Sequence, residues 1–199
     1  MTSFKAAQLI AKANDADKVV FLLDRIELST QSADEYRGFA NADDNVLDTE
    51  DTRNLVRVLE SDSKDECLIV TSIQKMSRIT PAHNIPQTTI DHINAKRVVF
   101  IVDECHRSVA GLGRDSGSGM LLTIKNTFPR AILFGFTGTP IFAENAKQDH
   151  TTAEVFGECL HRYLIKDAIA DENVLGFLVE YYKGQQDTDL FNEKRMTEI

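Results

Sequence analysis

The stretch Val98-Val99-Phe100-Ile101-Val102-Asp103-Glu104-Cys105-His106 decides the fold that this sequence predicts. Its first five residues are apolar and four of them are β-branched, which is typical of a strand buried on both faces of a sheet. Asp103 and Glu104 follow where such a strand ends, and ligands of open parallel sheets bind beyond the carboxyl ends of strands. The two acids therefore indicate either a site for a metal-bound nucleotide or an acidic turn after a core strand.

A second apolar run, Ala131-Ile132-Leu133-Phe134, leads into the sequence Thr137-Gly138-Thr139-Pro140. We expect Gly138 to permit a close backbone approach or a positive φ, and Pro140 to stop the strand. Taken alone, this tetrapeptide is better explained as a turn. Its position at a strand end, downstream of the acidic pair, makes a functional role the better interpretation.

Strands and helices alternate along the rest of the chain, which predicts an α/β fold with a doubly wound, mainly parallel sheet flanked by helices. Ser3 is a candidate N-cap of the first helix, which should carry Phe4, Ala7, Ile10 and Ala11 on one face. The pattern weakens after Pro140. The predicted helices cover residues 2–14, 28–36, 52–59, 89–94 and 120–127, and the further strands cover residues 19–23 and 67–70.

The longer strings Asp103-Glu-Cys-His-Arg-Ser108 and Phe136-Thr-Gly-Thr-Pro-Ile141 resemble the Walker-B and coupling motifs of superfamily-two helicases and translocases. They are similar to the motor (R) subunit of type I restriction-modification enzymes. The resemblance covers about residues 2–183, implying a first RecA-like motor domain, with residues 184–199 as a polar tail or linker towards a second one. It implies ATP hydrolysis within a type I site-specific deoxyribonuclease, with ATP and Mg²⁺ as cofactors and movement of duplex DNA as the result.

The same resemblance names methyltransferase and specificity subunits as partners. Two other interpretations remain open. One is another DNA or RNA helicase of the superfamily, although D-E-A-D-type RNA helicases usually carry S-A-T where this chain has Thr137-Gly138-Thr139. The other is a binding or scaffold module that hydrolyses nothing.

By resemblance, Asp103 holds Mg²⁺ and Glu104 orients or deprotonates the attacking water. His106 then relays the state of the nucleotide to Thr137, Gly138 and Thr139. A lone histidine is more often structural than chemical, and only its place in the motif favours the relay. Cys105 is interpreted as a small packing residue.

The resemblance also implies contacts with the DNA backbone beyond two other strands. Arg25 could donate two hydrogen bonds to a phosphate and Gln31 one, although Asp24 capping a helix beside a surface Arg25 is nearly as good an interpretation. The second set opens a helix, where ordinary capping by Thr71 or Ser72 is the alternative. This second set consists of Thr71, Ser72, Gln74 and Lys75.

One motif expected from the resemblance does not occur in this sequence: G-x-x-x-x-G-K-[ST]. The glycine-rich residues 111–119 contain no lysine followed by serine or threonine, so they are interpreted as a surface loop, with DNA contact as the alternative. The helix over residues 2–14 resembles the one that follows a phosphate loop. We therefore expect a truncated motor domain whose central P-loop strand is missing, leaving a gap in the sheet. The second motor domain and a nuclease domain would be missing too, and the isolated chain should show little or no ATPase activity.

Composition suits one α/β domain of 199 residues, with 42% hydrophobic and 27% charged residues. The formal charge of −9 counts against nucleic acid as a partner, although a basic groove can coexist with it. Three widely separated cysteines without a C-x-x-C pattern argue against a disulfide framework or zinc site and fit a reducing cytoplasm. No apolar run approaches the roughly 18 residues of a membrane span, and no signal peptide is evident.

Overall fold

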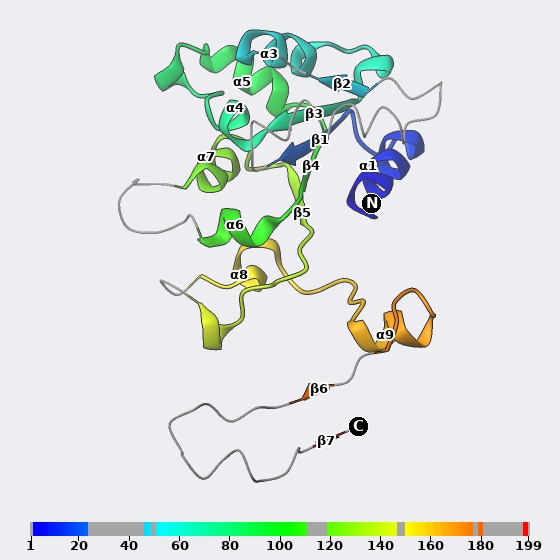
Figure 1. The fold of residues 1–199 in the computed structure, drawn as a ribbon. Coiled ribbons are helices and arrows are strands. Elements are labelled where there is room, and N and C mark those ends of the chain that lie inside the picture. The colour runs from blue at the N-terminus through cyan, green and yellow to red at the C-terminus, as the bar shows by residue number, and fades with distance from the viewer. Residues whose placement is uncertain are drawn as a thin grey trace. The chain divides into compact units, whose positions relative to one another are not determined.

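Parallel strands form the centre of the larger of two units in the computed structural model (Figure 1). The structure describes residues 2–23, 46–48, 51–110, 119–146, 150–176, 179–180 and 197–198. The units are Met1–Glu158, which contains the sheet, and Cys159–Ile199, which contains α9 (Ile165–Ala170) and an antiparallel pair, β6 (Val179–Glu180) with β7 (Thr197–Glu198). The proposed division into a motor domain ending at residue 183 and a tail stays a prediction.

The strands of the main sheet lie in the order β2-β3-β1-β4-β5, and every pairing between neighbours is parallel. The predicted α/β fold with a parallel sheet is thus confirmed, but the expected gap in the sheet is wrong for the described strands, because each of them pairs with its neighbour in this order. Because parallel strands need crossovers, the alternation of strands and helices in the sequence translates directly into this architecture. The strands are β1 (Lys18–Leu23), β2 (Val46–Asp48), β3 (Leu68–Ser72), β4 (Val98–Val102) and β5 (Ile132–Gly135).

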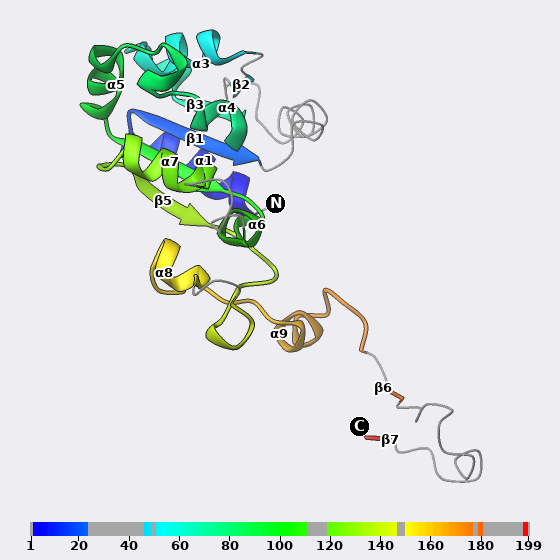
Figure 2. The same ribbon diagram turned by 90° about the vertical axis from the view of Figure 1, so that its left-hand side faces the viewer.

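Helices cover both faces of the sheet (Figure 2). Successive side chains of a strand point to opposite faces, so Val19 and Phe21 of β1 pack with α1 (Thr2–Ala13), whereas Val20 and Leu22 face the other way. On that second face the core is completed by α3 (Thr52–Glu60), α4 (Ile73–Ser77), α5 (Gln87–Asn94) and α7 (Met120–Thr127). Two shorter helices, α6 (Cys105–Ala110) and α8 (Thr152–Phe156), pack against the same core near the ends of β4 and β5.

The strand β5 differs from its neighbours in burial. Residues of β1, β3 and β4 are buried along the whole length of each strand, whereas no residue of β5 is, and Ile132 is 57% exposed. Within the described part of the chain, β5 pairs with β4 alone and forms an edge of the sheet. An apolar strand exposed at an edge can accept a further strand.

The structure confirms most of the predicted elements, corrects the cap of one helix and adds elements that the sequence did not predict, among them α6. The predicted helix over residues 2–14 is α1, and the residues expected on its apolar face do pack against the sheet. Ser3 is not its N-cap, because the helix already begins at Thr2 and Ser3 is buried inside the first turn. The strand β2 was not predicted. The helix expected over residues 28–36 lies outside the described residues. Among the residues described, no helix has the length and apolar character needed to cross a membrane.

Candidate functional site

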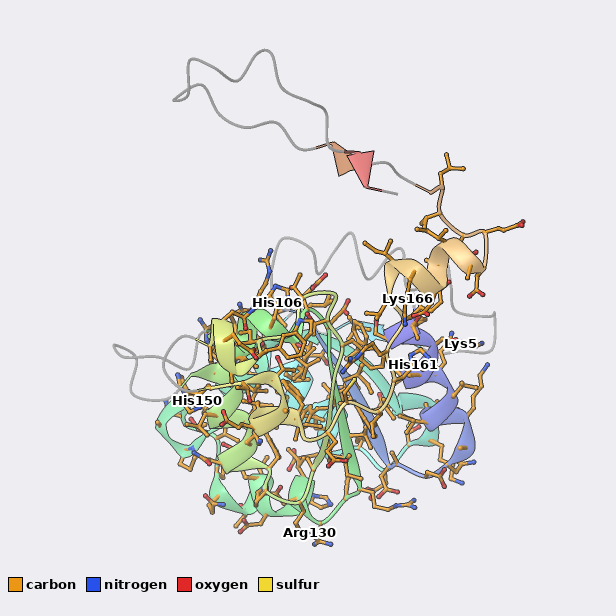
Figure 3. The ribbon with its side chains drawn as sticks, turned by 90° about the horizontal axis from the view of Figure 1, so that it is seen from below. Lys5, His106, Arg130, His150, His161 and Lys166 are labelled. Carbon is orange, nitrogen blue, oxygen red and sulfur yellow. The ribbon has the colours of Figure 1, made fainter. Side chains whose placement is uncertain are left out.

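The ends of β4 and β5 lie side by side, and backbone hydrogen bonds continue the pairing beyond both strands. Val102 is in register with Gly135, the Phe136 N–H donates to the Val102 carbonyl at 2.9 Å, and the Cys105 N–H donates to the Phe136 carbonyl at 3.0 Å. The residues that follow β4 are therefore held against those that follow β5. As Figure 3 illustrates, His106 lies at the opposite end of this unit from Arg130, which precedes β5.

Asp103 is half-buried at the carboxyl end of β4, where its N–H donates to the Leu22 carbonyl of β1 at 3.2 Å. Burial raises the pKa of the Asp103 carboxyl, and the neighbouring Glu104 carboxylate adds to the rise. Hydrogen bonds from the Glu104 backbone N–H and the Ser3 hydroxyl act in the opposite direction on this pKa. The ion pairs found among described residues do not include Asp103. A bound cation would stabilise the ionised form of this carboxylate.

We expect Asp103→Asn to stabilise the chain at neutral pH. Since the folded-state pKa of Asp103 lies above the ordinary 3.8, its ionised form opposes folding at every pH above that folded-state pKa. Removing the charge should raise the free energy of unfolding by about 0.5–2 kcal/mol at pH 7, and the gain should disappear as pH falls towards 3.8. Urea denaturation between pH 4 and pH 8 measures the gain in the free energy of unfolding at neutral pH and its loss towards low pH. The exposed Asp65→Asn serves as control, and a loss of stability for Asp103→Asn at pH 7 would contradict the argument.

Glu104 has a backbone conformation that is rare for residues other than glycine. Its φ is +46°, in the left-handed region, and its side chain is 59% exposed. This conformation turns the chain from β4 into α6 and directs the carboxylate outwards, with Oε2 3.4 Å from Nδ1 of His106. Left-handed backbone in a residue with a Cβ costs roughly 1–2 kcal/mol. Strain of this kind concentrates at functional sites.

The strain at Glu104 can be tested without any assay of activity. We expect Glu104→Gly to be about 1 kcal/mol more stable than Glu104→Ala, because glycine adopts a positive φ without a steric penalty. At the exposed helical position Arg53 in α3, the order should reverse, with glycine about 1 kcal/mol less stable than alanine. Thermal and urea unfolding of the four variants give the comparison. Equal or lower stability of Glu104→Gly would show that the turn holds no strain.

Side chains join the ends of the two strands directly. Nδ1 of His106, the second residue of α6, lies 2.8 Å from Oγ1 of Thr137, and the N–H of Thr139 donates to the same Oγ1 at 3.0 Å. The Thr137 hydroxyl can both accept and donate, so it can bond to the ring nitrogen in either tautomer. A movement of the turn at Asp103 and Glu104 would therefore shift His106 and with it the hydrogen bond to Thr137.

Gly138 departs from the role that the sequence predicts for it, whereas Cys105 is consistent with its predicted role. Gly138 has neither a positive φ nor a close neighbour: a Cβ built on it would meet nothing within 4 Å, so the expected steric reason for this glycine is wrong for the described residues. Cys105 is fully buried, and burial raises the pKa of its thiol to about 12. A thiol of that pKa stays protonated near neutral pH, consistent with its interpretation as a packing residue.

The residues expected to contact DNA have less support from the structure. Arg25 and Gln31 lie outside the described residues, as does most of the glycine-rich loop. Thr71 and Ser72 are fully buried, and the Ser72 hydroxyl accepts from the Lys75 N–H at 3.3 Å as the N-cap of α4. The capping alternative therefore describes Ser72, and neither hydroxyl can reach a DNA backbone without movement of the strand end. Gln74 and Lys75 are partly exposed on α4, and their contact with DNA stays a prediction.

Two features of the site were not anticipated. The contact between Ser3 and Asp103 brings together residues 100 positions apart, and no motif in the sequence announces it. Gly135 lies against Cys105 and Phe156, closer than any side chain would allow. No group of three or more His, Cys, Asp or Glu side chains that could hold a metal ion occurs in the part of the chain that the structure describes.

A family model and several known proteins match the sequence of this chain. A family model described as the SWI2/SNF2 ATPase matches residues 1–199 of the chain. The chain belongs to the SWI2/SNF2 ATPase family. Together with the relatives described next, this match confirms the resemblance seen at the two strand ends.

Relatives of this SWI2/SNF2 ATPase chain include endonuclease subunits of type I restriction enzymes. The SauCOLORF180P subunit of Staphylococcus aureus (strain COL) is 47% identical over 182 residues, 91% of this chain and 18% of the relative. The HindI subunit of Haemophilus influenzae is 28% identical over 84% of this chain and 16% of its own length. In Mycoplasma pneumoniae, the C-terminal part of a putative MpnIIP subunit is 37% identical over 56% of this chain and 52% of that protein. The chain thus spans less than a fifth of the length of the full-size relatives that it matches.

Proposed function

We propose that this chain is part of the first motor domain of a type I restriction endonuclease subunit, which couples ATP hydrolysis to movement along duplex DNA. The observation that carries the proposal is the 2.8 Å contact between His106 Nδ1 and Thr137 Oγ1. It joins the acidic residues that follow β4 to the hydroxyl residues that follow β5, as a device that links nucleotide state to a second ligand requires. The proposed domain covers residues 2–183, with residues 184–199 as the linker that follows.

Asp103 fits the role of a magnesium ligand. It offers a hard oxygen donor in a half-buried place, and this burial raises the pKa of its carboxyl. Mg²⁺ in nucleotide sites is held by one or two carboxylates together with phosphate oxygens, so a closed set of protein ligands is not required. When bound, the ion would neutralise charge on the phosphates. The Ser3 hydroxyl positions the carboxylate from α1.

Glu104 is the residue that we assign to the attacking water. Its exposed carboxylate projects from a left-handed turn beside Asp103, where it can accept a proton or orient a water molecule. His106 contacts both Glu104 and Thr137 through the same Nδ1. A rearrangement at the acidic turn would therefore alter the backbone of Thr137–Thr139. We assign contact with the DNA backbone to Arg25, Gln31, Gln74 and Lys75, with methyltransferase and specificity subunits as protein partners.

The proposal is tested with a full-length type I endonuclease subunit that contains this chain as its motor segment. We expect ATP hydrolysis by that protein to rise on addition of duplex DNA and to need Mg²⁺. If the full-length subunit binds duplex DNA but hydrolyses no ATP with or without it, the scaffold interpretation is the correct one. Stimulation by single-stranded RNA in place of duplex DNA would indicate a different helicase of the superfamily.

The 199-residue chain by itself should bind ATP weakly. Its sequence contains no phosphate-loop lysine preceding serine or threonine, and that lysine together with backbone amides supplies much of the grip on the β- and γ-phosphates. A titration with a fluorescent ATP analogue and Mg²⁺ should give no saturation at micromolar concentrations. Saturable micromolar binding, competed by unlabelled ATP, would contradict this expectation and place the phosphate contacts within the printed sequence.

A further inference from the structure

The place where β5, α6 and α8 meet is packed so closely that only glycine fits. A Cβ built on Gly135, the last residue of β5, would lie 2.8 Å from Sγ of Cys105 and 2.9 Å from the ring of Phe156. Real Cβ atoms are essentially never found at such distances from other atoms. Cys105 directly precedes His106, and Gly135 is two residues before Thr137. The contact therefore involves residues one and two positions away from those that form the hydrogen bond between the two strand ends.

A second attachment holds the far end of the same segment. The Ile141 N–H donates to Oγ1 of Thr152 at 2.8 Å, and the Thr152 N–H donates back to the Ile141 carbonyl at 2.9 Å. Thr152 is the first residue of α8, and Phe156 is its last. One five-residue helix thus holds the chain at Gly135 and again at Ile141, on either side of Thr137–Pro140.

The helix α8 is itself fixed to the body of the fold. The Lys125 ammonium of α7 donates to the Val155 carbonyl at 2.7 Å, at the C-terminal end of α8, where a cation also interacts favourably with the helix dipole. Thr151 and Glu154 form a capping box at its N-terminus, with hydrogen bonds of 3.2 Å and 2.7 Å. Since α7 buries Leu121 and Ile124 in the core, α8 is connected to a part of the fold away from the site.

We propose that α8 is a positioning element for the strand ends, and that Thr152 and Phe156 are the residues through which it keeps Thr137 against His106. Displacement of Phe156, or loss of the two bonds between Thr152 and Ile141, lets the segment Thr137–Pro140 move away from α6. The consequence for catalysis rests on the proposed function, because only there does the His106–Thr137 contact link ATP to DNA. The positioning itself does not depend on any activity.

The first test reads the histidine directly in the 199-residue chain. Nitrogen-15 NMR of the histidine side chains reports the tautomer and hydrogen bonding of His106, whose signals are assigned by their loss in His106→Asn. Thr152→Val removes the hydroxyl that accepts from Ile141 while keeping the shape of the side chain, and it should move the His106 ring-nitrogen signals. Thr152→Ser should restore these signals towards the positions of the unsubstituted chain, and the exposed Thr88→Val should leave them unchanged.

A second variant distinguishes a change in positioning from a failure of Thr152→Val to fold. Gly135→Ala should move the same signals, and combining it with Cys105→Ala should recover part of the change because the Sγ atom 2.8 Å away is removed. Gly176→Ala is the matched control, since a Cβ there meets nothing within 4 Å. The proposal is overturned if Thr152→Val and Gly135→Ala both leave His106 unchanged, or if Thr152→Ser moves its signals as far as Thr152→Val does.

The catalytic consequence is measured separately in the full-length subunit. Thr152→Val should lower the stimulation of ATP hydrolysis by duplex DNA by about 5- to 150-fold, the range of typical coupling between two sites. If the NMR signals move while stimulation is unchanged, α8 positions Thr137 but the coupling role assigned to that residue is wrong. If the signals stay in place and the unsubstituted subunit is stimulated by DNA, the proposed function stands and the positioning role of α8 is wrong.

Discussion

Replacing Glu104 with glutamine is expected to lower DNA-stimulated ATP hydrolysis by the full-length subunit by about 10²- to 10⁴-fold, the usual contribution of a positioned general base. Glutamine keeps the size of the side chain and the hydrogen bond to water, but it cannot take a proton. The substitution leaves Asp103 in place, so affinity for ATP and Mg²⁺ should stay within a few-fold of the unsubstituted value. Steady-state hydrolysis and equilibrium nucleotide binding, measured on the same preparation, separate the two effects.

Glu172→Gln is the matched control for this experiment. Glu172 is also an exposed glutamate with a left-handed backbone, at φ +58°, but it lies outside the unit that contains the sheet. Its substitution should leave hydrolysis unchanged. A Glu104→Gln subunit that retains more than about a tenth of the activity would show that another group activates the water, and the assignment of Glu104 would then be wrong.

Replacing Thr137 with valine is expected to separate hydrolysis from its stimulation by DNA. Valine preserves the shape of threonine but removes the oxygen that lies 2.8 Å from His106 and accepts from the Thr139 N–H. Hydrolysis without DNA should change little, because Asp103 and Glu104 are untouched, whereas the stimulation by duplex DNA should fall by about 5- to 150-fold. The ratio of rates with and without DNA is the quantity to measure.

Thr137→Ser distinguishes loss of the hydroxyl from loss of packing. Serine retains the oxygen without the methyl group, so it should recover most of the stimulation that valine loses. Equal loss in the serine and valine variants would mean that the methyl group, and not the hydrogen bond to His106, is what the site needs. A valine variant with full stimulation would remove Thr137 from the coupling path.

The position of the site could be predicted because strong local signals mark both strand ends. Runs of β-branched and aromatic residues specify β4 and β5, and polar residues directly after them belong to the same edge of a parallel sheet. The full set of strands and their order could not be predicted. β2 is three residues long, and nothing in its sequence distinguishes it from a loop. The path of the chain between β1 and β2 lies outside the described residues.

The glycines of the site could not be interpreted correctly from the local sequence. The sequence favoured Gly138 as the position that needs a missing side chain, because it sits in a turn-like tetrapeptide. In the structure the close contact is at Gly135, and a positive φ belongs to Glu104 instead. Close approach depends on Cys105 and Phe156, which reach Gly135 only through the tertiary fold. The positive φ at Glu104 follows from the turn between β4 and α6, which no propensity of glutamate would suggest.

The DNA contacts predicted for Thr71 and Ser72 and the cap predicted at Ser3 were uncertain for the same reason. Hydroxyl residues near a helix start serve as caps, as phosphate ligands or as core groups, and sequence alone does not separate these roles. Ser72 is a cap, whereas Ser3 lies within the first turn of its helix and bonds to Asp103. Burial decides between the alternatives, and burial depends on which elements pack around each residue.

The central claim is that the ends of β4 and β5 work as one unit through His106 and Thr137, and a double-mutant cycle tests it most directly. DNA stimulation of ATP hydrolysis would be measured for the full-length subunit and for His106→Ala, Thr137→Val and the double variant. Since the two side chains share one hydrogen bond, the double variant should be no worse than the more damaging single variant. If the two losses multiply instead, His106 and Thr137 act independently, and the proposed coupling between the strand ends is wrong.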